Sequence, residues 1–186
     1  MQFLRKLYRL LFSWNFPAAS EKELVEADAI IAMAFGATKD GSPGRGNHTI
    51  ARVTEELLQK YHLPLLAEWY MAQANPALPY VLIAKPTPAG NEPSTSAYHT
   101  QTVAQELARE CWKKGWRKII VLASPDHMGR VIWTYEKLGM EVFPAKMPND
   151  GYYGSGYVQT WSHSSRWRWR CKEVLVRILF WYWGYI

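Results

Sequence analysis

His127 and Arg130 are the two side chains of this sequence best suited to act on a ligand. They stand three residues apart in a predicted helix over residues 126–138, so they lie one turn above each other on its polar side. An imidazole with an ordinary pKa can give or take a proton near neutral pH, which makes His127 the candidate catalytic residue. A guanidinium can hold a phosphate or carboxylate through two hydrogen bonds, which makes Arg130 a candidate ligand-binding residue.

The elements around this pair would place it at a ligand-binding edge. The β-branched run over residues 118–123 predicts a strand buried on both faces, with Ser124 and Pro125 as the N-cap and first residue of the helix. Open parallel sheets bind ligands beyond the carboxyl ends of their strands, and a helix start favours an anion, so Ser124 joins the ligand-binding candidates. The alternative is a solvated helix face without a ligand, in which Asp126 only complements the helix dipole.

The same stretch carries a family resemblance. It reads SPDHMGRV, then a helix, LGMEV and FPA, and is similar to the signature of the bacterial YdcF/SanA/ElyC family, a domain of largely undefined function. The resemblance spans residues 27–150 and, more weakly, the last helix, where Glu173 matches a family glutamate. It implies a Rossmann-like fold and, for some members, a role in envelope biogenesis. It leaves the activity open.

A Gly-rich loop after the first predicted strand is the second candidate region. The strand covers residues 27–35, and GATKDGSPGRGN leads from it to a helix over residues 49–61. Such a loop can hold a phosphate through backbone N–H groups, and an ordinary surface loop is the alternative. Both GxGxxG and GK[ST] are absent, so the sequence identifies no dinucleotide, ATP or other cofactor.

The family resemblance adds residues to the expected ligand site. Those that match the family pattern are Gly36, Asp40, Gly41, Arg52, Glu92 and Ser94. Arg52 is expected to open a helix, an unfavourable place for a cation unless an anion offsets it. One departure is Glu68-Trp69-Tyr70, which puts bulky side chains where the family usually has Ser-Gly-Gly.

Alternating strand and helix signals predict a three-layer, Rossmann-like α/β domain with a mainly parallel sheet. The strands are expected near residues 28–35, 64–69, 80–84, 118–123 and 140–143, and the helices near 49–61, 97–112 and 126–138. The runs at 29–35 and 119–123 lack polar alternation and should be neighbouring interior strands. No internal repeat or linker divides the chain, so residues 27–186 should form one domain behind an N-terminal extension over residues 1–26.

Composition points to a globular chain with anionic partners. The 186 residues are 48% hydrophobic and 20% charged, with a net charge of +6 at pH 7. Cys111 and Cys171 stand alone, without CxxC or a His/Cys cluster, so neither a disulfide framework nor a metal site is predicted. Arg and Trp alternate near the C-terminus, but no RNA- or DNA-binding motif accompanies them, which argues against nucleic acid as a partner.

Both ends of the chain are basic, aromatic and amphipathic. Residues 1–16 put apolar side chains on one helical face and Arg and Lys on the other, in a segment too short and too charged to span a bilayer. A final helix over residues 166–183 has an apolar face that includes Trp167, and a charged face, including Arg170 and Glu173, laced by i,i+3 and i,i+4 pairs. Both segments fit a membrane surface, and the alternative for residues 1–16 is a helix docked on the domain.

Two functions are compatible with these features. The first is binding of an anionic or nucleotide-like small molecule at the carboxyl edge of the sheet. No set of nucleophile, base and orienting group can be read from the sequence, so it assigns no reaction and leaves open whether the protein is an enzyme. The second is a non-enzymatic role in the bacterial envelope, as a cytoplasmic protein held at the inner face of the membrane.

Overall fold

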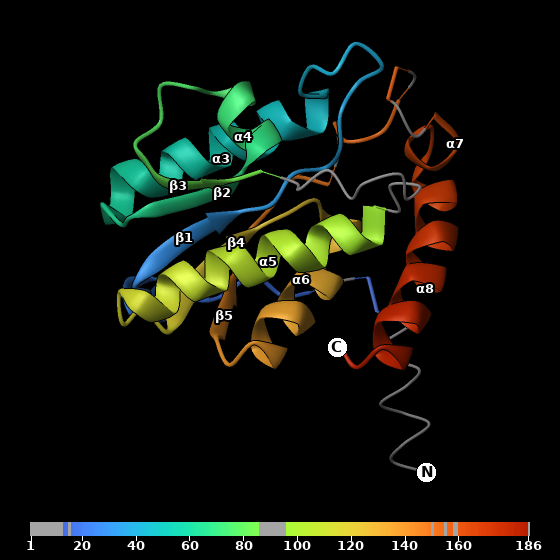
Figure 1. Ribbon diagram of the computed structural model, residues 1–186. Helices are drawn as coiled ribbons and strands as arrows, with labels where there is room; N and C mark the ends of the chain where they lie inside the picture. The colour runs from blue at the N-terminus through green and yellow to red at the C-terminus, as the bar shows by residue number, and fades with distance from the viewer. Residues whose placement is uncertain are drawn as a thin grey trace.

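A computed structural model describes residues 13, 14, 16–85, 96–149, 151–154, 156, 157 and 160–185. Strands and helices alternate along most of this chain (Figure 1). The strands are β1 (Ala29–Ala32), β2 (Leu65–Glu68), β3 (Tyr80–Ala84), β4 (Lys118–Leu122) and β5 (Glu141–Pro144). The helices are α2 (Glu21–Val25), α3 (Arg45–Tyr61), α4 (Trp69–Ala74), α5 (Ser96–Lys113), α6 (Pro125–Lys137), α7 (Thr160–His163) and α8 (Arg166–Tyr182).

The five strands form one parallel sheet in the order β3-β2-β1-β4-β5, which confirms the predicted α/β fold. β1 and β4 are interior neighbours, in a register that pairs Ala29 with Ile119 and Ala32 with Leu122. The chain fills one side of the sheet with β2 and β3 and then crosses back to the other side with β4 and β5. The strand order therefore reverses between β1 and β4.

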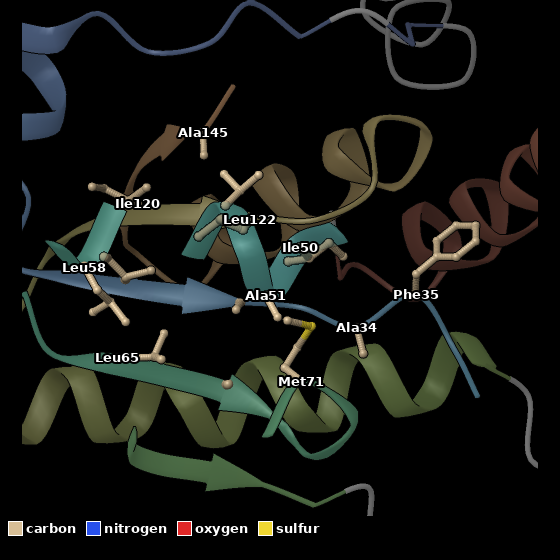
Figure 2. Packing of buried hydrophobic residues seen from close by; sticks show 14 of the residues in the cluster. Ala34, Phe35, Ile50, Ala51, Leu58, Leu65, Met71, Ile120, Leu122 and Ala145 are labelled. Carbon is tan, nitrogen blue, oxygen red and sulfur yellow. The ribbon is translucent and has the colours of Figure 1, made fainter. Parts of the chain in front are cut away.

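Strand residues alternate between two apolar layers because successive side chains of a strand point to opposite faces. On one face Ile30 and Ala32 pack with α3 and α4, where Ile50 and Met71 are fully buried (Figure 2). On the other face the neighbouring strand residues pack against α5 and α6. Full burial of a large aliphatic side chain contributes about 1.5–3 kcal/mol relative to exposure, so both layers hold the sheet in place.

The observed elements differ from the predicted ones at several points, and the short helices α2 and α7 are among those not predicted. β1 ends at Ala32 rather than residue 35. The Met33 N–H still donates to the Leu122 carbonyl of β4, but the N–H groups of Ala34 and Phe35 donate to the side chains of Glu68 and Asn47. α3 begins at Arg45, four residues earlier than predicted. The short helix α4 follows β2 without being predicted; its Met71 and Ala72 are buried.

Helix α8 lies beyond the carboxyl ends of the strands, where it packs against α6 and α7 (Figure 1). The start of the described N-terminal extension lies on the same side, with the Phe16 ring 5.5 Å from that of Trp133 in an edge-to-face contact. The extension then continues to α2 at the opposite end of the sheet, where Glu21 pairs with Lys60 and Glu26 pairs with Lys118. Among the described helices, none is both long enough and apolar enough to cross a membrane.

Candidate functional site

The first turn of α6 follows β4 directly at the carboxyl edge of the sheet. Ser124 and Pro125 occupy the N-cap and first helical position, as predicted. The Ser124 carbonyl accepts hydrogen bonds from the backbone N–H groups of His127 and Met128, both at 2.9 Å. Its hydroxyl is fully buried and makes no capping hydrogen bond. This turn lies at the reversal of strand order between β1 and β4, the usual ligand position in open α/β sheets.

His127 and Arg130 are buried, so the alternative of a solvated helix face is wrong, and the side of α6 on which they were predicted is covered by other parts of the chain. Their exposed fractions are 3% and 2%. Helix α8 and the described end of the N-terminal extension cover them. Gly129 lies between the two residues, and a Cβ on it would come within 2.5 Å of the Phe16 ring. The missing side chain therefore lets the covering segments approach α6 closely.

Glu173 of α8 is the residue that Arg130 binds. Arg130 donates from Nε to Oε1 at 2.9 Å and from Nη2 to Oε2 at 3.1 Å, which is a bidentate pair. Arg177 donates to Glu173 Oε1 at 3.3 Å and to the Ser13 carbonyl at 2.9 Å. Arg130 thus binds a carboxylate in the expected bidentate geometry, but this carboxylate belongs to the protein itself and not to a ligand.

Asp126 forms a second ion cluster in the same turn, with a buried carboxylate and partly exposed arginine partners. Its carboxylate accepts hydrogen bonds from Arg166 at 2.7 Å and Arg170 at 2.8 Å, and from the Tyr153 hydroxyl. Asp126 therefore does more than complement the helix dipole, because it ties the start of α6 to the first turns of α8.

The two clusters together carry an excess of positive charge. Two buried carboxylates face four guanidinium groups, one from α6 and three from α8. Burial, assisted by Arg130, lowers the pKa of His127 to about 4, so its imidazole is neutral at pH 7. Two positive charges are therefore left over among these groups, which favours a further anion nearby.

Burial also changes what His127 can do chemically. A pKa of about 4 contradicts the expectation of an ordinary imidazole, and it makes the ring a weak base at neutral pH. Against the effect of burial, Arg130 and His127 hold the pKa of Glu173 below its ordinary value. Burial raises the pKa of Glu68, and the Ala34 N–H and Arg130 offset part of that rise. The Glu68 carboxylate, which accepts from Ala34 at 3.0 Å, thus belongs to the same electrostatic environment.

Three buried polar atoms near the start of α6 have no hydrogen-bond partner within the described part of the chain. They are Ser124 Oγ, His127 Nδ1 and Arg130 Nη1. His127 Nδ1 lies 3.9 Å from Glu173 Oε2, which is beyond hydrogen-bond distance. Buried polar groups are almost always paired, and leaving one unpaired costs about 1–3 kcal/mol. Three such atoms within seven residues are therefore unusual and need an explanation.

The start of α3, at the same edge, is closed by the protein's own groups. Asn47 accepts a hydrogen bond from the Phe35 N–H and donates one to the Gly36 carbonyl, both at 2.7 Å. The Gly46 N–H donates to the Tyr157 hydroxyl at 3.1 Å. These contacts satisfy several of the groups that the Gly-rich loop was expected to offer to a phosphate.

A chain of ring contacts leads from Gly36 to His127. Gly36 has a φ of +102°, and a Cβ there would lie 2.9 Å from His163 Nε2, so the position requires glycine. The His163 ring lies 4.6 Å from that of Trp169, which lies 6.1 Å from the His127 ring. Gly36 and His127 thus share an edge of the sheet, but the side chains of His163 and Trp169 lie between them where a common ligand site was expected.

Asp40 and Gly41 form an exposed turn. Asp40 accepts hydrogen bonds from the Thr38 hydroxyl and from the Ser42 hydroxyl and N–H, which lower the pKa of Asp40 to about 2. Gly41 has a φ of +81°, in the left-handed region that glycine tolerates. The observed contacts of Asp40 are with the turn itself.

Arg52 lies two helical turns from the start of α3, so the prediction that it opens the helix is wrong. Its side chain is 61% exposed and pairs with Glu56 at 2.6 Å. The error comes from the helix start, which lies at Arg45 inside the Gly-rich segment. The other two candidates, Glu92 and Ser94, fall outside the described residues.

Helix α8 supplies Glu173 and Arg170 to the site, although the sequence predicted that both belong to a charged face whose residues pair with each other along the helix. Its buried residues are Trp169, Glu173, Val176, Arg177 and Phe180. Their spacing is that of one helical stripe, and Glu173 is the single acidic residue in a helix rich in arginine. Those two signals could have indicated a buried ion pair, but alternating charge on a helix more often indicates solvent exposure.

Comparison with known proteins gives no match to any family model or any curated protein. The YdcF/SanA/ElyC resemblance therefore stays a prediction that depends on the residues quoted for it. Within the described residues, no three His, Cys, Asp or Glu side chains come together as metal ligands.

Proposed function

We propose that the protein binds a small anionic ligand, such as a phosphate-bearing molecule, at the start of α6. The observation that carries the proposal is the set of three buried polar atoms without a partner, on Ser124, His127 and Arg130. A hydroxyl, an imidazole nitrogen and a guanidinium nitrogen can all donate to the oxygen atoms of one anion. Their place beyond β4, where the strand order reverses, is the one at which open α/β sheets bind ligands.

The charge of the surroundings supports an anion over a neutral or cationic ligand. The carboxylates of Asp126 and Glu173 leave two of four neighbouring guanidinium groups uncompensated. The first turn of α6 adds the positive end of a helix dipole. Arg130 and Arg177 are buried, where charges are weakly screened, while Arg166 and Arg170 are partly exposed to solvent.

In this proposal His127 binds the ligand, and proton transfer is not its task. With a pKa of about 4 it is neutral at pH 7, and in the tautomer protonated at Nδ1 it donates a hydrogen bond to an anion oxygen. The residues identify no nucleophile and no reaction. The resemblance to the YdcF/SanA/ElyC family supports a place for this binding activity in the bacterial envelope.

The test compares two buried hydroxyl groups of α6, one at the N-cap of the helix and one further along it. Ser124 Oγ and Thr134 Oγ1 are both fully buried and lack a partner, but Thr134 lies in the third turn of α6, away from the sheet edge. Titration calorimetry would measure binding of phosphate, pyrophosphate and ADP to the wild type, Ser124→Ala and Thr134→Val. We expect Ser124→Ala to weaken binding by on the order of 1.5–3 kcal/mol, the value of a hydrogen bond to a charged group, and Thr134→Val to have no effect. Absence of binding by all three probes, or an equal loss in both variants, contradicts the proposal.

A further inference from the structure

Helix α8 is turned with part of its charged side inward and its most apolar side outward. Its buried stripe contains Glu173 and Arg177, which pair with each other and with α6. On the opposite side Trp167 and Tyr182 are 73% and 78% exposed. An amphipathic helix on a globular domain normally buries its apolar face, so this orientation needs a reason.

The exposed apolar side chains of α8 form a concentrated patch. Those with large side chains are Trp167, Leu175, Ile178, Leu179, Trp181 and Tyr182. Apart from Trp183 at the C-cap of the same helix, the other exposed large apolar residues of the described chain are Val25, Val81 and Trp112, each on a different element. Single exposed apolar residues are ordinary, but a contiguous patch marks an interaction surface.

We propose that the outer face of α8 lies in the interface of an anionic lipid bilayer, with the helix parallel to the membrane surface. Trp and Tyr near both ends of the helix, with Leu and Ile between them, match the residues that prefer the headgroup boundary. A helix of 17 residues that lies flat places this whole row at one depth. None of the described helices could span the bilayer instead.

The charges of α8 favour lipid as the occupant. Its single acidic residue, Glu173, is buried, while Arg168 is exposed and Arg166, Arg170 and Lys172 are partly exposed. Basic residues at a membrane surface are attracted to anionic headgroups. A second copy of this chain would instead bring like charges together.

The N-terminal segment supports the same occupant. Ser13 accepts a hydrogen bond from Arg177, and the Trp14 ring lies 4.3 Å from the Arg177 guanidinium carbon, so the start of the described chain lies beside α8. The sequence that precedes Ser13 includes Arg5, Lys6 and Arg9. These basic residues add to the positive charge of the chain, which suits an anionic surface.

The test compares two triple variants of the full chain. One replaces outer residues of α8 (Trp167→Ser, Leu175→Ser and Tyr182→Ser), and the matched control replaces exposed apolar residues elsewhere (Val25→Ser, Val81→Ser and Trp112→Ser). Flotation with phosphatidylcholine vesicles, with and without phosphatidylglycerol, measures the bound fraction. Circular dichroism checks that both variants fold.

We expect the wild type and the control to float with the anionic vesicles. The affinity of the α8 variant for these vesicles should be lower by about tenfold or more. Binding should also fall as salt is raised. Equal recovery with neutral and anionic vesicles overturns the proposal, and so does undiminished binding of the α8 variant. Sedimentation velocity adds one more outcome: a wild-type dimer that the α8 variant dissociates, without vesicle binding, would identify a second copy as the occupant and overturn the membrane proposal.

Discussion

Helices α3 and α6 begin at the same edge of one parallel sheet, and the chain completes their starts in different ways. At α3 the side chain of Asn47 pairs with the backbone of Phe35 and Gly36, and the Tyr157 hydroxyl takes the Gly46 N–H. At α6 the contacts are ionic, and polar atoms of three buried residues stay without a partner in the described chain.

This difference separates a structural helix start from a candidate binding site. Folded proteins rarely leave buried polar groups unpaired unless a ligand, an ion or water serves them. The Gly-rich loop has the composition of a phosphate site, but its polar groups at the start of α3 are paired within the protein. The Ser-Pro turn at the start of α6 is the place where buried polar atoms lack a partner. Composition alone therefore does not locate the site; the accounting of hydrogen bonds does.

Among the substitutions at these two helix starts, Glu173→Ala should cause the largest loss of stability. The substitution removes the carboxylate that pairs with both Arg130 and Arg177, and it leaves two guanidinium groups buried without that partner. Breaking a buried pair in this way costs about 3–5 kcal/mol, so we expect a loss of that size in the free energy of unfolding. Urea denaturation followed by circular dichroism would measure it.

Glu56→Ala is the matched control for that variant. It also removes a glutamate from an Arg–Glu pair, but both side chains of the Arg52–Glu56 pair are mostly exposed. Exposed pairs contribute about 0–1 kcal/mol, so the control should unfold almost like the wild type. Similar small losses in both variants would mean that the ionic cluster does not hold α8 on α6.

Asn47→Ala tests whether the start of α3 is structural. It removes both side-chain partners of the Phe35 N–H and the Gly36 carbonyl, in a position that is fully buried. Leaving the buried Phe35 N–H unpaired costs about 1–3 kcal/mol, and loss of the hydrogen bond to the partly buried Gly36 carbonyl adds about 1 kcal/mol, so we expect a loss of about 2–4 kcal/mol in the free energy of unfolding. Affinity for pyrophosphate should stay unchanged under conditions where the variant is folded. A selective loss of affinity without a loss of stability would move the binding site to α3.

The sheet could be predicted from the sequence because apolar runs such as residues 29–32 and 119–122 depend on local patterning alone. The orientation of α8 could not. Periodicity gives its two stripes, one apolar and one mixed, but partners on α6 that are about 40 residues away decide which stripe faces inward. The misplaced start of α3 has a similar cause, because its N-cap, Gly44, has no side chain to signal it.

A pH dependence of stability is also expected from His127. Burial and Arg130 lower its pKa to about 4 in the native protein, against 6.5 for an ordinary imidazole. As the pH falls below 6.5 the unfolded chain binds a proton that the native protein does not, so the free energy of unfolding decreases. The contribution is fully present well above pH 6.5 and is lost between pH 6.5 and about 4, by on the order of 3 kcal/mol.

Other groups act in or near this range, so the measurement must isolate His127. Glu68 and Glu136, whose pKa values burial raises, contribute with the opposite sign just above pH 4.5, while the lowered pKa of Glu173 adds to the loss below it. The difference in unfolding free energy between wild type and His127→Gln, followed by urea denaturation from pH 7 to 4, removes these shared contributions. We expect the wild type to lose stability more steeply than the variant between pH 6.5 and 4.5. Parallel curves would show that His127 is not held neutral at the start of α6, and the binding role proposed for its neutral ring would lose its basis.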